Sequence, residues 1–187
     1  VILMPGLVNA HCHLDYTDFA GAIPSTHSFT DWIRAMVDLK VDVDDAAHRQ
    51  SWLRGAQQCL RHGITTLGNI ETRLNVLPEL WHQTPLRMVS FLEIILLKRE
   101  SDSAQELGKL KAWVQEHVPP HGCVGLSPHA PYTTKIELLE GCAEFGDLPM
   151  TMHVGESAEE DQMFREGVGA MFDFLTEAGR DMNDCAG

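Results

Sequence analysis

Short apolar runs recur along the chain and are separated by longer amphipathic stretches. Each run has about the length of a strand, and several are nearly continuous in apolar residues, as strands buried on both faces are. The sequence therefore predicts five strands, over Leu7–His13, Ile64–Ile70, Leu86–Leu96, Cys123–Ser127 and Leu148–Val154.

The stretches between these runs have the pattern and the end signals of helices. Gly63 and Gly146 stand where a helix C-terminus is expected, and Pro119-Pro120 ends the helix that precedes it. Because strand and helix alternate five times, we predict an α/β fold with a parallel sheet and helical crossovers. The predicted helices cover Phe29–Leu39, Asp44–His62, Ser103–His117, Lys135–Phe145, Glu159–Arg165 and Ala170–Ala178.

Two α/β architectures fit this alternation: a closed eight-stranded barrel and an open doubly wound sheet. The nucleotide-binding form of the open sheet carries G-x-G-x-x-G after its first strand, or a G-x-x-x-x-G-K-[ST] loop. Neither pattern occurs in the sequence. With 187 residues and no internal repeat or linker, the chain is interpreted as one domain, residues 1–187.

Charge and cysteine content narrow the partners and the compartment. The formal net charge of −13 argues against a nucleic-acid surface and against binding to an anionic membrane, and favours solubility. No apolar stretch is long enough to cross a bilayer, and the first ten residues lack the basic start of a signal peptide. The five cysteines are scattered and form no C-x-x-C pair, which predicts reduced thiols in a cytoplasmic protein.

The first candidate site is the pair His11 and His13 at the end of the first predicted strand. Residues i and i+2 of a strand point to the same face, so the two imidazoles would project side by side, with Cys12 on the other face. Two imidazoles at that separation can share a divalent cation. Two half-buried histidines with local hydrogen bonds would account for the same pattern.

The second candidate site is His153, in the fifth predicted strand, with Glu156 in the loop that follows. A third imidazole would complete a set of three nitrogen ligands, and a carboxylate that stays off the metal could move protons for a bound water. Taken singly, His153 could be a core histidine, and Glu156 could be a carboxylate at a helix entry.

The third candidate is His129, between Pro128 and Pro131 after the fourth predicted strand. The two prolines stiffen the loop, which suits a histidine that touches substrate, although a loop histidine can also cap nearby carbonyls. All three candidates fall at the C-terminal ends of predicted strands. In an α/β barrel the active site is built on that rim, so together they favour a metal site.

Two further residues are candidates for substrate binding. Glu71 follows the second predicted strand on the same rim, where it would line the pocket or face solvent. Trp32 lies on the first predicted helix, where a tryptophan is more often a core residue than a substrate platform.

Four segments, in order, resemble the motifs of the amidohydrolase superfamily. The nearest branch contains the cytosine, guanine, S-adenosylhomocysteine and aminodeoxyfutalosine deaminases together with the chlorohydrolases. The combination of motifs is specific, and the resemblance runs from Met4 to about Glu160. The segments read LMPGLVNAHCHLDY, GITTLGNI, GLSPHAPYTT and MTMHVGESAEE.

The resemblance implies a (β/α)8 TIM-type barrel that carries one divalent metal ion, zinc or iron, with zinc favoured. By position, His11, His13 and His153 match the metal ligands of strands one and five. Glu156 matches the proton-shuttling glutamate and His129 the histidine that contacts substrate. The implied reaction is hydrolytic deamination of an aminated purine or pyrimidine-type heterocycle by a metal-bound hydroxide.

The sub-branch and the bond cleaved stay open at this point. SFTDWIRAMVDL, and RMVSFLEII with Glu93, look most like the aminodeoxyfutalosine-type enzymes. The methylthioadenosine deaminases have a ribose-binding glutamate shortly after a tryptophan like Trp32, but here the sequence reads Val37-Asp38-Leu39-Lys40. Related branches use the same site on C–Cl bonds or cyclic amides, and a non-catalytic remnant that serves only in assembly is a further alternative.

The resemblance also implies parts that these 187 residues do not contain. The family's strand-eight aspartate ligand, its strand-six histidine and a small β-domain have no counterpart here. Since an eight-stranded barrel takes about 250 residues, we expect an incomplete barrel of about five strand–helix units. Completion would come from further sequence of the same polypeptide or from a homo-oligomeric partner, and the segment alone is expected to be inactive.

Overall fold

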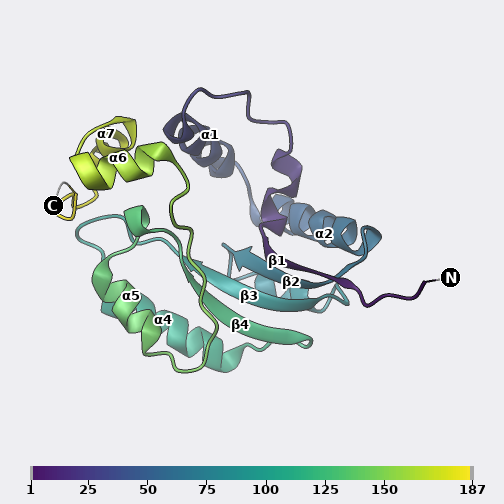
Figure 1. The fold of residues 1–187 in the computed structure, drawn as a ribbon. Coiled ribbons are helices and arrows are strands. Elements are labelled where there is room, and N and C mark those ends of the chain that lie inside the picture. The colour runs from purple at the N-terminus through teal and green to yellow at the C-terminus, as the bar shows by residue number, and fades with distance from the viewer. Residues whose placement is uncertain (1, 186–187) are drawn as a thin grey trace.

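Four parallel strands form one twisted sheet, shown in Figure 1. The structure is a computed structural model that describes residues 2–185, so Val1 and residues 186–187 of the predicted domain lie outside the described residues. The strands are β1 (Leu7–Cys12), β2 (Ile64–Glu71), β3 (Arg87–Ile94) and β4 (Gly122–Pro128).

The strands lie side by side in the order in which they occur in the chain, β1-β2-β3-β4. A doubly wound sheet reverses its order at a switch point, whereas a barrel adds each strand next to the preceding one. The order therefore decides between the two architectures that the alternation left open. The fold is α/β, and the sheet is part of a TIM-type barrel.

Seven α-helices and two short 3-10 helices occur within residues 2–185. Most predicted helix ends agree with the structure to within two residues. The helices are α1 (Phe29–Val41), α2 (Asp45–Arg61), α3 (Leu77–Trp81), α4 (Ser103–Glu116), α5 (Ile136–Ala143), α6 (Ala158–Glu166) and α7 (Ala170–Glu177), with the 3-10 helices η1 (Leu14–Phe19) and η2 (Pro131–Thr133). None of these described helices combines the length and apolarity needed to cross a bilayer.

The fifth predicted strand, Leu148–Val154, differs from expectation. It lies beside β4 through the single parallel bridge Leu126–Met150, with the Thr151 amide donating to the Leu126 carbonyl at 3.0 Å. The next rung would need an N–H from Pro128, which has none. The segment is therefore extended and correctly placed next to β4, but it does not continue as a regular strand.

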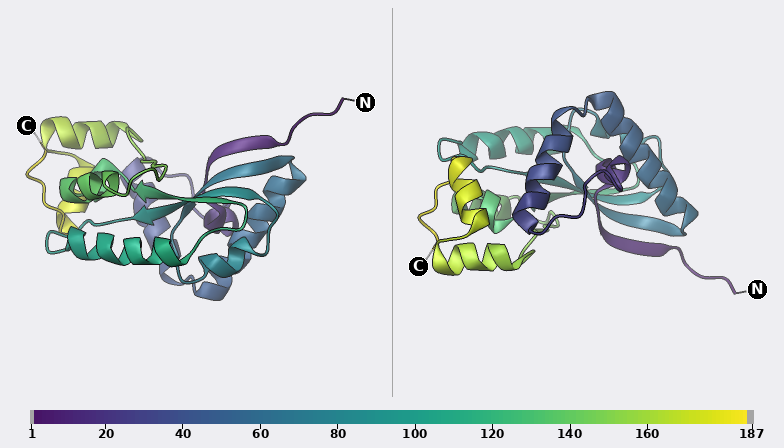
Figure 2. Two further views of the ribbon diagram at one scale, coloured as in Figure 1. Left: turned by 90° about the horizontal axis from the view of Figure 1, so that it is seen from below. Right: turned by 90° about the horizontal axis from the view of Figure 1, so that it is seen from above.

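Two cores hold the structure together. The larger one lies between the sheet and helices α2 to α5, and at its centre Trp52 and Leu67 are fully buried. The smaller core joins η2 to α1, α6 and α7, and includes Tyr132 and Met163. In both views of Figure 2 the C-terminal helices lie at the opposite end of the molecule from the N-terminus.

Strand parity assigns each side chain to a face of the sheet. Met88 and Leu92 of β3 belong to the larger core, so Phe91 and Glu93 point to the opposite face, which is the inner face of a barrel. Phe91 fits there because its neighbours are small: a Cβ on Gly125 would lie 2.6 Å from its ring. The inner face also carries the histidines described below.

Candidate metal centre and surrounding residues

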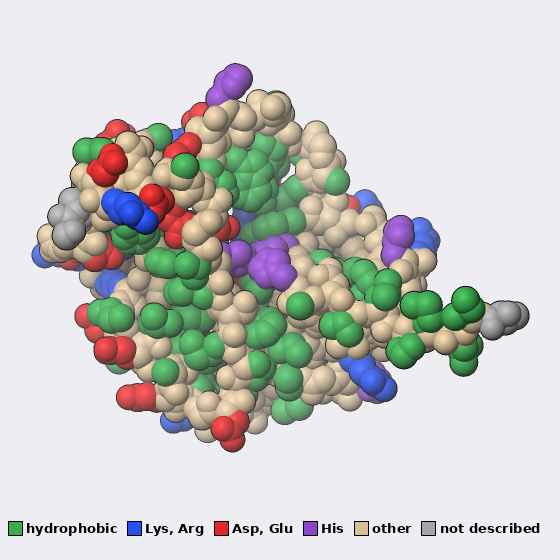
Figure 3. All heavy atoms as spheres, viewed as in Figure 1, with side chains coloured by type: hydrophobic (Ala, Val, Ile, Leu, Met, Phe, Trp, Pro, Cys, Tyr) green, Lys and Arg blue, Asp and Glu red, His purple; other side chains and the backbone are tan. Residues whose placement is uncertain are grey.

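Three imidazoles meet at the C-terminal rim of the sheet. The Nε2 atom of His153 lies 3.3 Å from Nε2 of His13 and 3.3 Å from Nε2 of His11. His11 and His13 come from the end of β1 and His153 from the extended segment beside β4, as the sequence predicted. Figure 3 shows histidine side chains gathered in a hollow between the helical end of the molecule and the sheet.

Hydrogen bonds orient this cluster through its surroundings. Nδ1 of His153 lies 3.0 Å from the carbonyl oxygen of His129, to which it donates, so its Nε2 carries the lone pair. The ring of His13 stacks on Tyr16 with centroids 5.0 Å apart. The chain just after His13 is fixed by Asn69, whose side-chain oxygen accepts from the Leu14 amide at 3.0 Å.

The surroundings favour the neutral form of His11 and His13. Burial in the first place, and then the neighbouring histidines, lower the pKa of His13 to about 3. Burial and His153 also lower the pKa of His11, while Glu156 raises it. Neutral imidazole is the form that binds metals.

The geometry fits a single divalent cation. Tetrahedral zinc with bonds of about 2.0–2.1 Å places its nitrogen ligands about 3.4 Å apart, close to the two 3.3 Å separations. His153 has one lone pair but faces two other nitrogens, so hydrogen bonding alone cannot satisfy all three. A cation shared by the three would satisfy each of them.

Glu156 lies beyond this cluster and is held by two contacts. Its Oε2 accepts a hydrogen bond from the Tyr132 hydroxyl at 2.6 Å. Its backbone amide donates to Oε2 of Glu160 at 2.7 Å. Glu156 is not among the described groups whose ligand atoms converge on a cation site. The charge of Glu156 acts on His11, whose pKa it raises, but its carboxylate oxygens are not among the converging ligand atoms.

His129 lies on the same rim with its ring beside that of His153, at a centroid separation of 5.1 Å. The Thr133 hydroxyl donates to the Ala130 carbonyl and therefore accepts from Nδ1 of His129, at 2.7 Å. This assignment leaves a lone pair on Nε2 of His129. Burial, followed by the charge of His153, lowers the pKa of His129 to about 3, which keeps the ring neutral.

Glu93 is a further acidic group in this site. A carboxylate oxygen of Glu93 and one nitrogen each of His129 and His153 lie within 4.8 Å of one another. Burial raises the pKa of Glu93 to about 7, and the charge of Lys40 opposes that shift. The sequence analysis quoted Glu93 only as part of a resembling segment. Its place at the end of the third predicted strand was the signal that could have assigned it to the site.

The structure corrects the interpretation of Glu71. The residue is 2% exposed, and its two carboxylate oxygens accept from Trp52 Nε1 at 3.0 Å and from Ser90 Oγ at 3.1 Å. It lies on the helix-covered face of the sheet, because it shares strand parity with Leu67 of the larger core. Glu71 therefore neither lines the histidine site nor faces solvent. Burial raises its pKa to about 8.

Trp32 lies on α1 and is 39% exposed, with its ring stacked on Phe29 at a centroid distance of 5.6 Å. No described contact joins it to the histidines. Two residues that the sequence analysis did not select lie closer to the site: Lys40 donates to the Tyr16 hydroxyl at 2.7 Å, next to His13. No sequence signal identified this contact, because it depends on how α1 packs over η1.

Comparison with known proteins identifies the family of this chain. The sequence model that defines the amidohydrolase family matches residues 2–184. The chain is 26% identical over 185 residues to the 5'-deoxyadenosine deaminase of Methanopyrus kandleri, covering 95% of this chain and 43% of that protein. It is 29% identical over 181 residues to the aminodeoxyfutalosine deaminase of Deinococcus radiodurans, covering 92% and 41%. The chain thus spans less than half the length of the curated relatives it matches.

The fold is shared with solved structures. Helicobacter pylori aminofutalosine deaminase in complex with methylthio-coformycin superposes with a TM-score of 0.77 at 21% identity, over 97% of this chain and 44% of that one. Guanine deaminase from C. acetobutylicum gives a TM-score of 0.72 at 13% identity. These two structures show that the fold is shared. The family is assigned from the match to the sequence model of the amidohydrolase family over residues 2–184. The chain belongs to the amidohydrolase family.

Proposed function

We propose that this chain forms the N-terminal half of a metal-dependent aminohydrolase that deaminates an aminated purine or related nitrogen heterocycle. The observation that carries the proposal is the convergence of three imidazoles, in which Nε2 of His153 lies 3.3 Å from Nε2 of His11 and 3.3 Å from Nε2 of His13. The carboxylate of Glu156 is separate from this set of ligand atoms. Relatives named 5'-deoxyadenosine deaminase, aminodeoxyfutalosine deaminase and 5-methylthioadenosine/S-adenosylhomocysteine deaminase support the same reaction class.

We propose zinc as the ion, held by His11, His13 and His153, since three imidazoles with an open position are typical of catalytic zinc. Such an ion lowers the pKa of a coordinated water towards neutrality. Glu156 would take one proton from the attacking water and deliver it to the ring nitrogen, and would then move the proton of the newly added hydroxyl to the amine, which leaves as ammonia while the ring carbonyl forms. General acid–base transfer of this kind is commonly worth about 10²–10⁴ in rate.

His129, Glu93 and Trp32 are the residues we propose for substrate contact. His129 offers a ring lone pair and Glu93 a partly buried carboxyl group on the same side of the sheet, and both can hydrogen-bond to the edge of a heterocycle. Trp32 presents a partly exposed aromatic ring on α1. Glu71 is left out of this set because both of its oxygens are committed to Trp52 and Ser90.

We further propose that the barrel is completed by sequence outside these residues. Four strands in sequential order, with an extended segment beside β4, account for about five of eight barrel units. The remaining strands would supply the fourth metal ligand and cover the exposed apolar residues of β1, of which Leu7 and Val8 are 53% and 69% exposed. The isolated segment is expected to bind metal weakly and to be inactive.

The experiment measures ammonia release by the full-length, zinc-loaded protein with 5'-deoxyadenosine, 5-methylthioadenosine, aminodeoxyfutalosine and guanine. We expect release from at least one adenine nucleoside, lost on chelation and restored by zinc. Glu156→Gln should lower kcat by about 10²-fold or more while zinc content is unchanged. Activity that survives both chelation and Glu156→Gln would refute the proposal, and so would a lack of ammonia release from all four compounds.

A further inference from the structure

Tyr132 is a buried residue whose hydroxyl points at the proposed proton-transfer group. It is 3% exposed, and its hydroxyl donates to Oε2 of Glu156 at 2.6 Å. The ring packs in the smaller core with Met163 and Met171, so the hydroxyl is held in place by its surroundings. Burial, followed by the hydrogen bond to Glu156, raises the pKa of Tyr132, which keeps the hydroxyl protonated as a donor.

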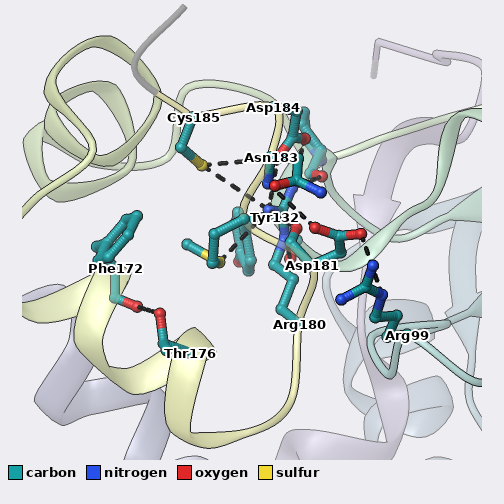
Figure 4. Close-up of polar contacts among 11 residues, drawn as sticks. Arg99, Tyr132, Phe172, Thr176, Arg180, Asp181, Asn183, Asp184 and Cys185 are labelled. Atoms are coloured by element: carbon teal, nitrogen blue, oxygen red, sulfur yellow. Dashed lines mark hydrogen bonds and ion pairs between the residues drawn. The ribbon is translucent and has the colours of Figure 1, made fainter.

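The loop that carries Tyr132 is fixed from its far side by Arg180. Nε of Arg180 donates to the Tyr132 carbonyl at 2.8 Å, and Nη2 lies 3.4 Å from the Pro131 carbonyl. Asp184 accepts from both terminal nitrogens of the guanidinium at 2.7 Å, and the Arg180 side chain is 7% exposed. Figure 4 shows Arg180 reaching between the 181–185 segment and Tyr132.

The two contacts of Glu156 leave one of its oxygens free. Tyr132 holds Oε2, and Glu160 holds the backbone amide through its own carboxylate, which also lies 3.3 Å from the Gly155 amide. No described hydrogen bond involves Oε1 of Glu156 among residues 2–185. A carboxylate held through one oxygen keeps its direction while the other oxygen exchanges protons.

We propose that Tyr132 is a positioning residue that aims the Glu156 carboxylate, and that Arg180 fixes the η2 loop from which Tyr132 acts. The inference rests on the proposed role of Glu156 in proton transfer. A planar guanidinium is suited to this task because its fork binds the Asp184 carboxylate and two backbone carbonyls at once, which a lysine ammonium cannot do in one fixed geometry.

The test compares Tyr132→Phe, Glu156→Gln and the double variant in the full-length, zinc-loaded protein. The probe is whichever nucleoside of the four-compound panel is deaminated fastest. We expect Tyr132→Phe to lower kcat by about tenfold with little change in KM, because a misdirected carboxylate slows proton transfer and leaves binding intact. In the Glu156→Gln background the same change should have no further effect on kcat.

Arg180→Lys provides a second variant, should Tyr132→Phe fail to fold, because it retains the Tyr132 hydroxyl but loosens the loop that carries it. We expect a smaller loss of kcat in the same direction. Arg165→Lys is the matched control, because within residues 2–185 the side chain of Arg165 makes only an exposed ion pair, with Asp161 on α6. It should leave kcat, KM and zinc content unchanged.

Amide hydrogen exchange decides the inference independently of activity. Tyr132→Phe should increase exchange of the segment 154–157 while leaving β1 to β4 protected, and Arg165→Lys should not. If the parent protein is inactive on every compound, the proposed function fails and hydrogen exchange still tests the contact. If the parent is active but Tyr132→Phe keeps its kcat, lowers kcat equally in the Glu156→Gln background, or leaves exchange unchanged, the positioning role is wrong.

Discussion

Replacing His153 with alanine tests the metal centre directly. His153 is the histidine that lies 3.3 Å from each of the other two, so its removal takes away the central nitrogen of the cluster. Loss of a residue that only hydrogen-bonds to a metal ligand typically lowers metal affinity about 10–100-fold. Loss of a ligand itself should therefore lower the affinity by about 100-fold or more. At about 1.36 kcal/mol per tenfold change, a 100-fold loss is roughly 2.7 kcal/mol of binding free energy.

The assay is competition for zinc with a chromophoric chelator at neutral pH, in the full-length protein. The matched control is His82→Ala, because His82 is an exposed histidine at the end of α3, before β3, and so lies at the opposite end of the strands. We expect His82→Ala to bind zinc as the parent does, and the circular dichroism of both variants to match the parent. If folded His153→Ala binds zinc as tightly as the parent, the three-histidine centre is refuted.

Three further predictions concern groups around the site. Because burial raises the pKa of Glu71 to about 8, the folded protein holds a proton that the unfolded chain releases above about pH 4.5. The free energy of unfolding should therefore fall from pH 5 to 8. Urea titrations across this range should show a smaller fall for Glu71→Gln than for the parent. Burial lowers the pKa of His48 to about 4, so the unfolded chain takes up a proton before the folded protein does as the pH falls below about 6.5. The free energy of unfolding should therefore decrease from pH 7 to pH 5, and this decrease should be smaller in His48→Gln. Glu159 accepts from the Phe29 and Thr30 amides at the start of α1, and Glu159→Ala should destabilise the protein by about 0.5–2 kcal/mol, with increased hydrogen exchange confined to the first turn of that helix; unchanged exchange there would contradict the capping role.

The histidine cluster could be predicted from sequence because it depends on two local rules. Residues i and i+2 of a strand share a face, which places His11 beside His13, and the C-terminal ends of parallel strands meet at one rim. Neither rule needs the packing of distant elements. The fifth strand was placed correctly next to β4 but was wrong as a regular strand, because Pro128 removes the donor that the next rung requires.

Glu71 shows where the same reasoning was incomplete. Its position at the end of β2 correctly placed it at the C-terminal edge of the sheet. The face to which it points, however, is the face of Leu67, four residues earlier in the strand, which packs against the helices. Counting back from Glu71 in steps of two would have assigned it to the buried face. Lys40 and Tyr16 are a different case, because their contact requires α1 to fold back over η1, and no local pattern specifies that.

The alternation of β1 would also couple binding of the proposed metal to folding. His11 and His13 project into the candidate centre while Cys12, between them, packs against the larger core. Any ligand that prefers the folded state raises its stability by mass action, by about 2.7 kcal/mol at a free concentration of one hundred times Kd. The melting temperature should consequently rise with zinc concentration. Substitutions in the part of the larger core that packs against Cys12 of β1 should also weaken zinc affinity, although they change no imidazole.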